Sequence, residues 1–184
     1  MYTFPKPGYK NSEKALEILK EGVKKYGVNE VVVASTYGTT GLQAASALKG
    51  FKTKVIVVTH NTGFREPGTL EMKSDTKAEI ESLGAVVYTG TMPFRNIGTA
   101  IRTTLGYSQQ DLIANTLRIL CQGIKVCVEI VMMASDAGLI GTKDVLAMAG
   151  TARGADTVAL IKPASSNNLF EIKIRDILAK PYDW

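Results

Sequence analysis

Short apolar runs alternate with stretches of helical periodicity along most of this chain. Val31 to Ala34, Lys54 to Thr59 and Ala85 to Tyr88 are brief runs rich in β-branched residues, which is typical of strands buried on both faces. Val145 to Ala149 and Thr157 to Ile161 are two further runs of this kind. Because strand and helix patterns alternate along most of the chain, we predict a mostly parallel sheet of about five strands.

Apolar residues at helical spacing fill the segments between these runs. We expect helices over Ser12 to Tyr26, Thr40 to Leu48, Thr69 to Leu83, Asn96 to Leu105 and Ser108 to Ala137. The tail from Glu171 to Ala179 fits a helix or a strand equally well. No repeat or linker divides the chain, so residues 1–184 are predicted to form a single three-layer α/β domain.

Composition narrows the class of protein only slightly. Hydrophobic residues make up 45% and charged residues 21% of the chain, which is ordinary for a globular domain. No apolar run approaches the roughly 20 residues that span a bilayer. The segment from Met1 to Lys10 lacks the apolar core of a signal peptide. We therefore expect a cytoplasmic protein with no membrane association.

The charged residues and cysteines point away from several other classes. The formal net charge is +5, but basic residues are spread along the chain and only 7% of residues are aromatic. This distribution predicts no nucleic-acid binding, although a basic surface would attract an anionic metabolite. Cys121 and Cys127 are expected on one long helix, too far apart for a disulfide and buried as small apolar residues. With one histidine and two helical cysteines, we expect no metal site.

The clearest functional signal follows the first apolar run. The segment consists of Ser35, Thr36, Tyr37, Gly38, Thr39 and Thr40, directly before a predicted helix. Free amides at a helix start attract anions, glycine permits close approach of a ligand, and hydroxyls donate to phosphate oxygens. A Ser/Thr-rich helix cap would explain one or two of these residues, but not so many together. We therefore predict phosphate binding without phosphoryl transfer, since neither a P-loop nor a Gly-x-Gly-x-x-Gly motif is present.

Turns after the other strands supply further candidate ligand contacts, because ligands of such sheets lie beyond the carboxyl ends of the strands. These candidates are Thr59, His60, Asn61, Thr89, Gly90, Thr91, Gly150, Thr151, Arg153 and Gly154. The guanidinium of Arg153 would bind phosphate in a bidentate manner, unless Arg153 is simply an exposed arginine of a hairpin. His60, the single histidine, is the candidate acid–base residue, with a structural hydrogen-bonding role as the alternative.

These motifs, in this order, resemble the C-terminal domain of pyruvate kinase. Val31 to Thr40, the helix after it and Val55 to Thr59 are similar to the strand, Ser/Thr-x-Gly-x-Thr loop, helix and strand of its sugar-phosphate effector site. Thr142 to Val145 and Gly150 to Thr157 resemble the last strand pair and the effector loop of that domain. Tyr37 departs from the family, which usually has serine before the loop glycine, and would offer a ring for an aromatic ligand.

The resemblance implies a stand-alone form of this domain, because the chain has no room for the catalytic barrel of pyruvate kinase. It implies FMN or another phosphorylated metabolite as the ligand, and a homo-oligomeric assembly. Three functions stay open at this point. The protein would be a ligand-binding protein, a flavin-dependent or phosphoester-handling enzyme that uses His60, or a metabolite-sensing module that docks on a partner protein.

Overall fold

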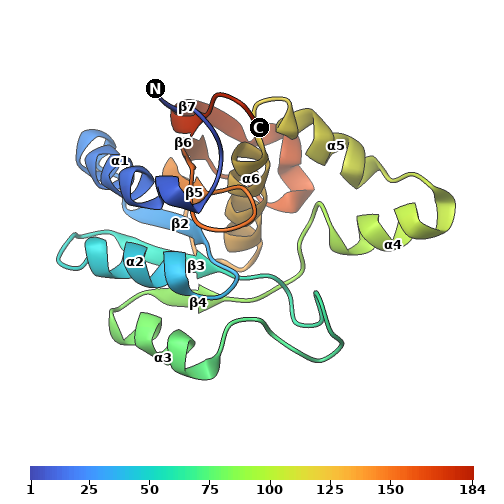
Figure 1. The fold of residues 1–184 in the computed structure, drawn as a ribbon, viewed down its shortest axis with the longest axis horizontal. Helices are drawn as coiled ribbons and strands as arrows, with labels where there is room; N and C mark the ends of the chain where they lie inside the picture. Colours follow the sequence, from blue (N-terminus) through green and yellow to red (C-terminus); the bar gives the residue numbers. More distant parts are fainter.

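A seven-stranded sheet in the order β1-β7-β6-β5-β2-β3-β4 runs through the computed structural model, which describes residues 1–184 (Figure 1). The strands are β1 Tyr2–Phe4, β2 Glu30–Ala34, β3 Lys54–Val58, β4 Val86–Tyr88, β5 Val145–Ala149, β6 Thr157–Lys162 and β7 Lys173–Pro181. Only β6 runs antiparallel to its neighbours. The prediction of a mostly parallel sheet is therefore confirmed, with seven strands instead of about five.

Helices cover both faces of this sheet and complete the three layers. They are α1 Ser12–Tyr26, α2 Thr39–Ala47, α3 Ser74–Ser82, α4 Asn96–Leu105, α5 Gln109–Arg118 and α6 Gln122–Asp136, with short 3-10 helices at Tyr9–Asn11 and Ser166–Glu171. One apolar core lies between the sheet and α1, α2 and α3, and the other lies beneath α6. Figure 1 shows α4 and α5 standing out to one side of the molecule. No helix combines the length and the apolar character needed to cross a bilayer.

Burial on both faces explains the β-branched runs of the sequence. In β2, Val31 and Val33 point into the core beneath α1 and α2, whereas Val32 points into the core beneath α6. All three side chains are fully buried. Successive side chains of a strand face opposite sides, so a central strand between two helical layers needs an apolar residue at every position.

Two predicted helices differ from the structure. The predicted helix over 108–137 is wrong in its middle, where α5 ends at Arg118 and α6 begins at Gln122. Cys121 has extended backbone there, and its sulfur accepts a hydrogen bond from the Ile124 amide at 3.4 Å, which caps α6. The predicted helix over 69–83 begins five residues later, at Ser74, because the preceding residues form a turn closed by the bond from Gly63 N to Thr69 O.

The two unpredicted strands lie at the ends of the chain. β1 has only three residues and pairs with the end of β7, from Tyr2 opposite Ala179 to Phe4 opposite Pro181. The pairing with β7 defines this short strand, because three residues are too few to show an alternation of apolar and polar residues. The tail that fitted either helix or strand is the strand β7, which pairs with β6 along most of its length.

Candidate functional site

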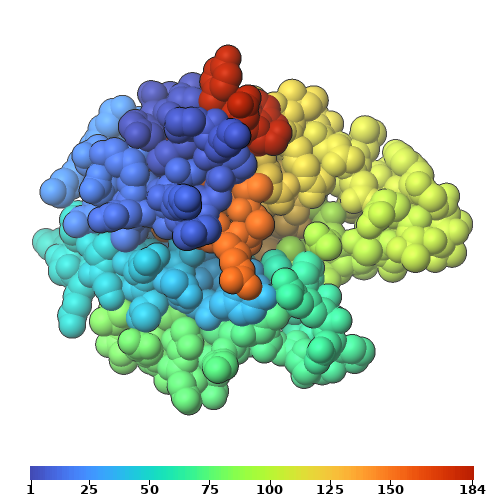
Figure 2. All heavy atoms as spheres, in the orientation of Figure 1, coloured from blue at the N-terminus to red at the C-terminus, as the bar shows by residue number.

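The loops after β2, β3 and β5 meet at the carboxyl edge of the sheet. From β2 the chain proceeds outward through β3 and β4, then returns to β5 on the other side of β2. The gap between β2 and β5 is therefore the topological switch point, where open α/β sheets bind their ligands. Figure 2 shows the segment around residue 152, in orange, crossing this edge against the light-blue start of α2.

The predicted phosphate loop lies at this switch point, between the end of β2 and the start of α2. Ser35 is buried, and its Oγ accepts a hydrogen bond from Gly41 N at 3.0 Å, which holds the loop against the first turn of α2. Gly38 has φ 98°, and a Cβ at this residue would overlap the side chain of Thr76. The backbone amides of Thr39 and Thr40 have no hydrogen-bond partner within the chain. Ser35 and Gly38 thus shape a loop that leaves two amides free for an anion.

Two arginines flank the aromatic ring of this loop. The Arg65 guanidinium lies 5.8 Å and the Arg153 guanidinium 5.7 Å from the centre of the Tyr37 ring, which is 39% exposed. Arg65 comes from the loop after β3 and Arg153 from the loop after β5. The ring attracts both cations by its quadrupole, and the two arginines bring positive charge to the predicted phosphate loop from either side.

His60 belongs to a row of three polar groups beside the loop. Its Nε2 lies 3.3 Å from Thr36 Oγ1, and its Nδ1 lies 3.2 Å from Glu71 Oε1. Glu71 is largely buried and also pairs with Arg65 Nε at 3.4 Å, while its Oε2 is buried without a partner. The Phe64 ring stacks against the imidazole at 3.9 Å between centres. A carboxylate on one ring nitrogen and a hydroxyl on the other is an arrangement suited to proton transfer.

The loop after β5 is braced by a buried carboxylate. Asp156 is fully buried and accepts hydrogen bonds from Gly8 N at 3.0 Å, Thr151 N at 3.1 Å and Thr157 Oγ1 at 2.8 Å. A Cβ at Gly150 or at Gly154 would overlap neighbouring atoms, and Gly154 has φ 73°. The Thr151 hydroxyl is buried and has no partner. These residues fix the loop that carries Arg153.

Three of the remaining predicted contacts, Thr59, Asn61 and Thr89, form hydrogen bonds within the chain. Thr59 Oγ1 lies 2.7 Å from Thr89 Oγ1 and donates to the His60 carbonyl at 2.7 Å. Asn61 Oδ1 accepts from Asn96 Nδ2 at 2.7 Å, which ties the loop after β3 to the start of α4. Gly90 and Thr91 follow β4, which is separated from β2 by β3. The structure therefore gathers the residues after β2, β3 and β5 and places those after β4 one strand further away.

Both cysteines are buried and free, Cys121 at the start of α6 and Cys127 within this helix. Burial raises the pKa of the Cys127 thiol well above its usual range, with a further contribution from the neighbouring Cys121. A buried thiol of this kind is unreactive. No three histidine, cysteine, aspartate or glutamate side chains come together in a group that could hold a metal ion.

A buried ion pair that the sequence interpretation missed lies in the first turns of α6. Lys125 is 3% and Glu129 1% exposed, and the two side chains pair with each other. Glu129 Oε1 also accepts a hydrogen bond from Phe94 N at 2.9 Å. A lysine and a glutamate four residues apart in an otherwise apolar helix were the available signal, because such charges are rarely buried unless they are paired.

Lys125 predicts a specific pH dependence of stability. Burial lowers the pKa of its ammonium from the ordinary value of 10.5; Glu129 opposes this shift, and the charges of Arg118 and Arg95 add to it. Between the lowered pKa and 10.5, the unfolded chain binds a proton that the folded chain has released, so the free energy of unfolding rises with pH in this window. Urea denaturation across this range should show a steeper rise for the native protein than for Lys125→Met. Parallel profiles would contradict the assignment.

Comparison with known proteins finds only weak likenesses of fold. No family model matches it. A pyruvate kinase from Cryptosporidium parvum is similar in fold, with a TM-score of 0.44 and 13% identity over 87% of this chain and 24% of the enzyme. An NMN synthetase from Francisella tularensis has a TM-score of 0.37 and 18% identity over 74% of this chain and 52% of the enzyme. The chain thus spans about a quarter and about half of these proteins, and the pyruvate kinase resemblance is confirmed only as a weak likeness of fold.

Proposed function

We propose that this protein binds a phosphorylated small molecule at the loop from Ser35 to Thr40. The observation that supports the proposal is the pair of free amides at Thr39 and Thr40, which start a helix at the switch point of the sheet. Arg65 and Arg153 stand on either side of the same loop, and guanidinium groups bind phosphate oxygens through paired hydrogen bonds. Helix amides, hydroxyls and arginines are together the donors that a phosphate needs.

FMN is the first ligand to test. The resemblance to stand-alone domains of the pyruvate kinase C-terminal type suggests it. The exposed Tyr37 ring and the stacked His60 and Phe64 rings offer aromatic surface beside the loop for the flat ring system of a flavin. A sugar phosphate would use the same phosphate contacts and would leave the aromatic surface without a stacking partner.

The first experiment identifies what the purified protein carries. The protein is denatured, and the released small molecules are examined by visible absorption and by mass spectrometry. A flavin spectrum supports FMN. A colourless phosphorylated compound supports the proposed site and shows that its ligand is that compound and not FMN. If nothing is released, a thermal-shift screen of phosphorylated metabolites follows, since a bound ligand raises the melting temperature. No shift with any of them would contradict the proposed function.

A second candidate function, acid–base catalysis, is favoured by the contact between His60 and Glu71. The carboxylate would hold one ring nitrogen in its protonated form and leave the other free to exchange a proton with a ligand near Thr36. The reactions to test are hydrolysis of a phosphate ester and oxidation of a reduced nicotinamide by the flavin-loaded protein.

His60→Ala should then reduce turnover by about 10²–10⁴-fold, the usual contribution of a general acid or base. Steady-state rates measure this loss, and a ligand titration with the same variant should show a much smaller loss of affinity, because the imidazole supplies only part of the aromatic surface. Lys143→Ala, which changes an exposed residue away from the site, serves as the control. Unchanged turnover in His60→Ala, or turnover and affinity lost in proportion, would show that His60 has no acid–base role.

A further inference from the structure

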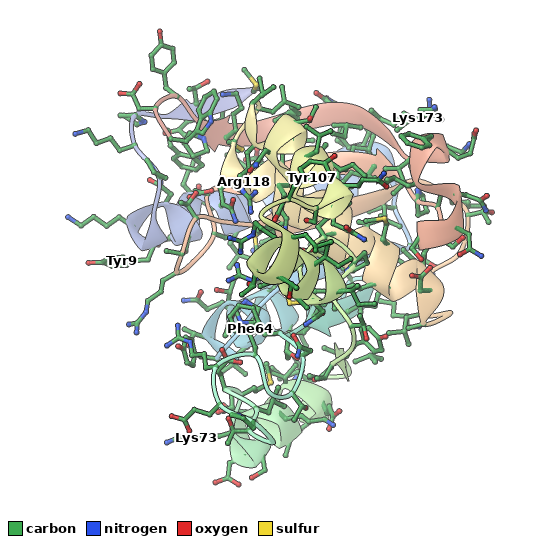
Figure 3. All side chains as sticks on the ribbon, turned by 90° about the vertical axis from the view of Figure 1, so that its right-hand side faces the viewer. Tyr9, Phe64, Lys73, Tyr107, Arg118 and Lys173 are labelled. Atoms are coloured by element: carbon green, nitrogen blue, oxygen red, sulfur yellow. The ribbon has the colours of Figure 1, made fainter.

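A second cluster of positive charge surrounds a pocket outside the phosphate loop. The pocket has a volume of about 300 Å³ and lies between α4, α5 and the first turn of α6. Phe94 is its single apolar residue, and its four cationic residues are Arg95, Arg102, Arg118 and Lys125. Figure 3, turned so that this side of the molecule faces the viewer, shows Arg118 near the α4 and α5 segment.

Two of the four cations have their charge compensated within the chain. Arg102 Nε pairs with Asp111 Oδ2 at 2.7 Å, and Lys125 pairs with Glu129 beneath the pocket. Lys125 also lies 5.6 Å from the centre of the Phe94 ring, so its buried stem and the ring form one wall. These pairs position the lining, and the uncompensated positive charge of the pocket comes from the other two residues, Arg95 and Arg118.

The guanidinium groups of the other two have no carboxylate partner. Arg118 donates to two neutral amide oxygens, Gln122 Oε1 at 2.6 Å and Asn115 Oδ1 at 2.7 Å. Arg95 is exposed, and its guanidinium lies over the Phe64 ring at 4.7 Å. Burial is the main cause of the lowered pKa of Lys125, and the charges of Arg118 and Arg95 add to it. Arg95 and Arg118 are therefore two cations of one pocket that no carboxylate of the chain neutralises, and an anion bound between them would offset their repulsion.

We propose that this pocket binds the doubly charged oxyanion group of a small molecule, either a phosphate or a pair of carboxylates. The Arg118 guanidinium is held in place by the side-chain amides of Gln122 and Asn115. Its remaining N–H groups have the planar geometry that suits the oxygens of a phosphate or a carboxylate. Asn115 and Thr99 also line the pocket and supply uncharged polar groups. The volume is at the lower end of the range for small-ligand sites.

The pocket uses none of the residues of the phosphate loop, so it stands independently of the function proposed above. The two places adjoin through a stack of side chains, in which Phe64 touches Arg95 on one side and His60 on the other. The Phe64 ring thus lies against both Arg95 of the pocket and the His60 imidazole.

The test is calorimetric titration with inorganic pyrophosphate at low ionic strength. Thr39→Ala and Thr40→Ala are introduced into every protein so that the loop contributes as little as possible. In this background, Arg95→Gln with Arg118→Gln should weaken pyrophosphate binding at least about tenfold. The control is Lys52→Gln with Lys143→Gln, which removes two exposed charges elsewhere. Arg95→Gln alone should already weaken binding, and the fold should tolerate it, because the exposed Arg95 side chain makes no hydrogen bond or ion pair within the chain.

Succinate in place of pyrophosphate separates the two kinds of ligand. If both anions bind, and Arg95→Gln with Arg118→Gln weakens the binding of both to the same extent, the pocket is a general oxyanion site. If only pyrophosphate binds, the pocket is a phosphate site. Equal affinities in the pocket variant and the charge-matched control, within about twofold, would overturn the proposal. So would absence of pyrophosphate binding up to about 10 mM in the background protein. If the loop substitutions themselves change nothing, the phosphate-loop proposal fails while the pocket result still stands.

Discussion

Glu129→Leu is expected to lower the free energy of unfolding by about 3–5 kcal/mol, the usual cost of removing one partner of a buried ion pair. The substitution leaves the Lys125 ammonium buried without its counter-ion, and it also removes the acceptor of the Phe94 amide. An unpaired buried charge and an unpaired buried amide both retain their desolvation cost. Chemical denaturation near neutral pH measures the loss.

Two companion variants separate the charge from the hydrogen bond. Glu129→Gln keeps an oxygen for the Phe94 amide and removes only the charge, so it should be less damaging than leucine. Lys125→Met combined with Glu129→Leu removes both charges, and it should recover much of the loss because a buried ion pair is often no more stable than apolar residues of similar size. A loss below about 1 kcal/mol in Glu129→Leu would show that the pair is not isolated from water.

The second large effect concerns ligand affinity. Thr39→Ala with Thr40→Ala should weaken phosphate binding by several kcal/mol at most, because each hydrogen bond to a charged group contributes about 1.5–3 kcal/mol. The amides of both residues remain in the variant, so some affinity should persist. Titration of the native protein and the double variant with the ligand identified above measures the difference.

α4 offers a matched control for this experiment. Thr103 and Thr104 are also adjacent threonines on a helix, and both are exposed. Their hydroxyls donate to carbonyls of their own helix, from Thr103 to Thr99 and from Thr104 to Ala100. Thr103→Ala with Thr104→Ala should leave affinity unchanged. Equal affinity in the loop variant and in the native protein would place the phosphate elsewhere.

The fold could be predicted to the extent that burial leaves a periodic signal. Central strands such as β2 are apolar at every position because both of their faces are buried, so the sequence identifies them. β1 is defined by its partner and has no such signal. The break between α5 and α6 depends on the extended backbone at Cys121, whereas the apolar spacing continues across it.

The candidate site shows the same division. The Ser35 to Thr40 loop and His60 were predicted because local chemistry and the strand order place them at one edge of the sheet. Glu71 was missed, since it lies eleven residues after His60 in a segment with helical spacing, and only the turn before α3 brings it back to the imidazole. Arg95 and Arg118 meet Lys125 through the packing of three helices, which periodicity cannot show.

The outer border of the sheet has a consequence for solution behaviour. β1 pairs with only the last three residues of β7, so Lys173 to Leu178 carry no strand on this side. Open edges of this kind recruit other chains into intermolecular β-structure unless charged side chains discourage it. Lys173, Arg175 and Asp176 supply such charges along the open stretch. We therefore expect these charges to discourage edge-to-edge pairing with other chains, a role independent of any ligand.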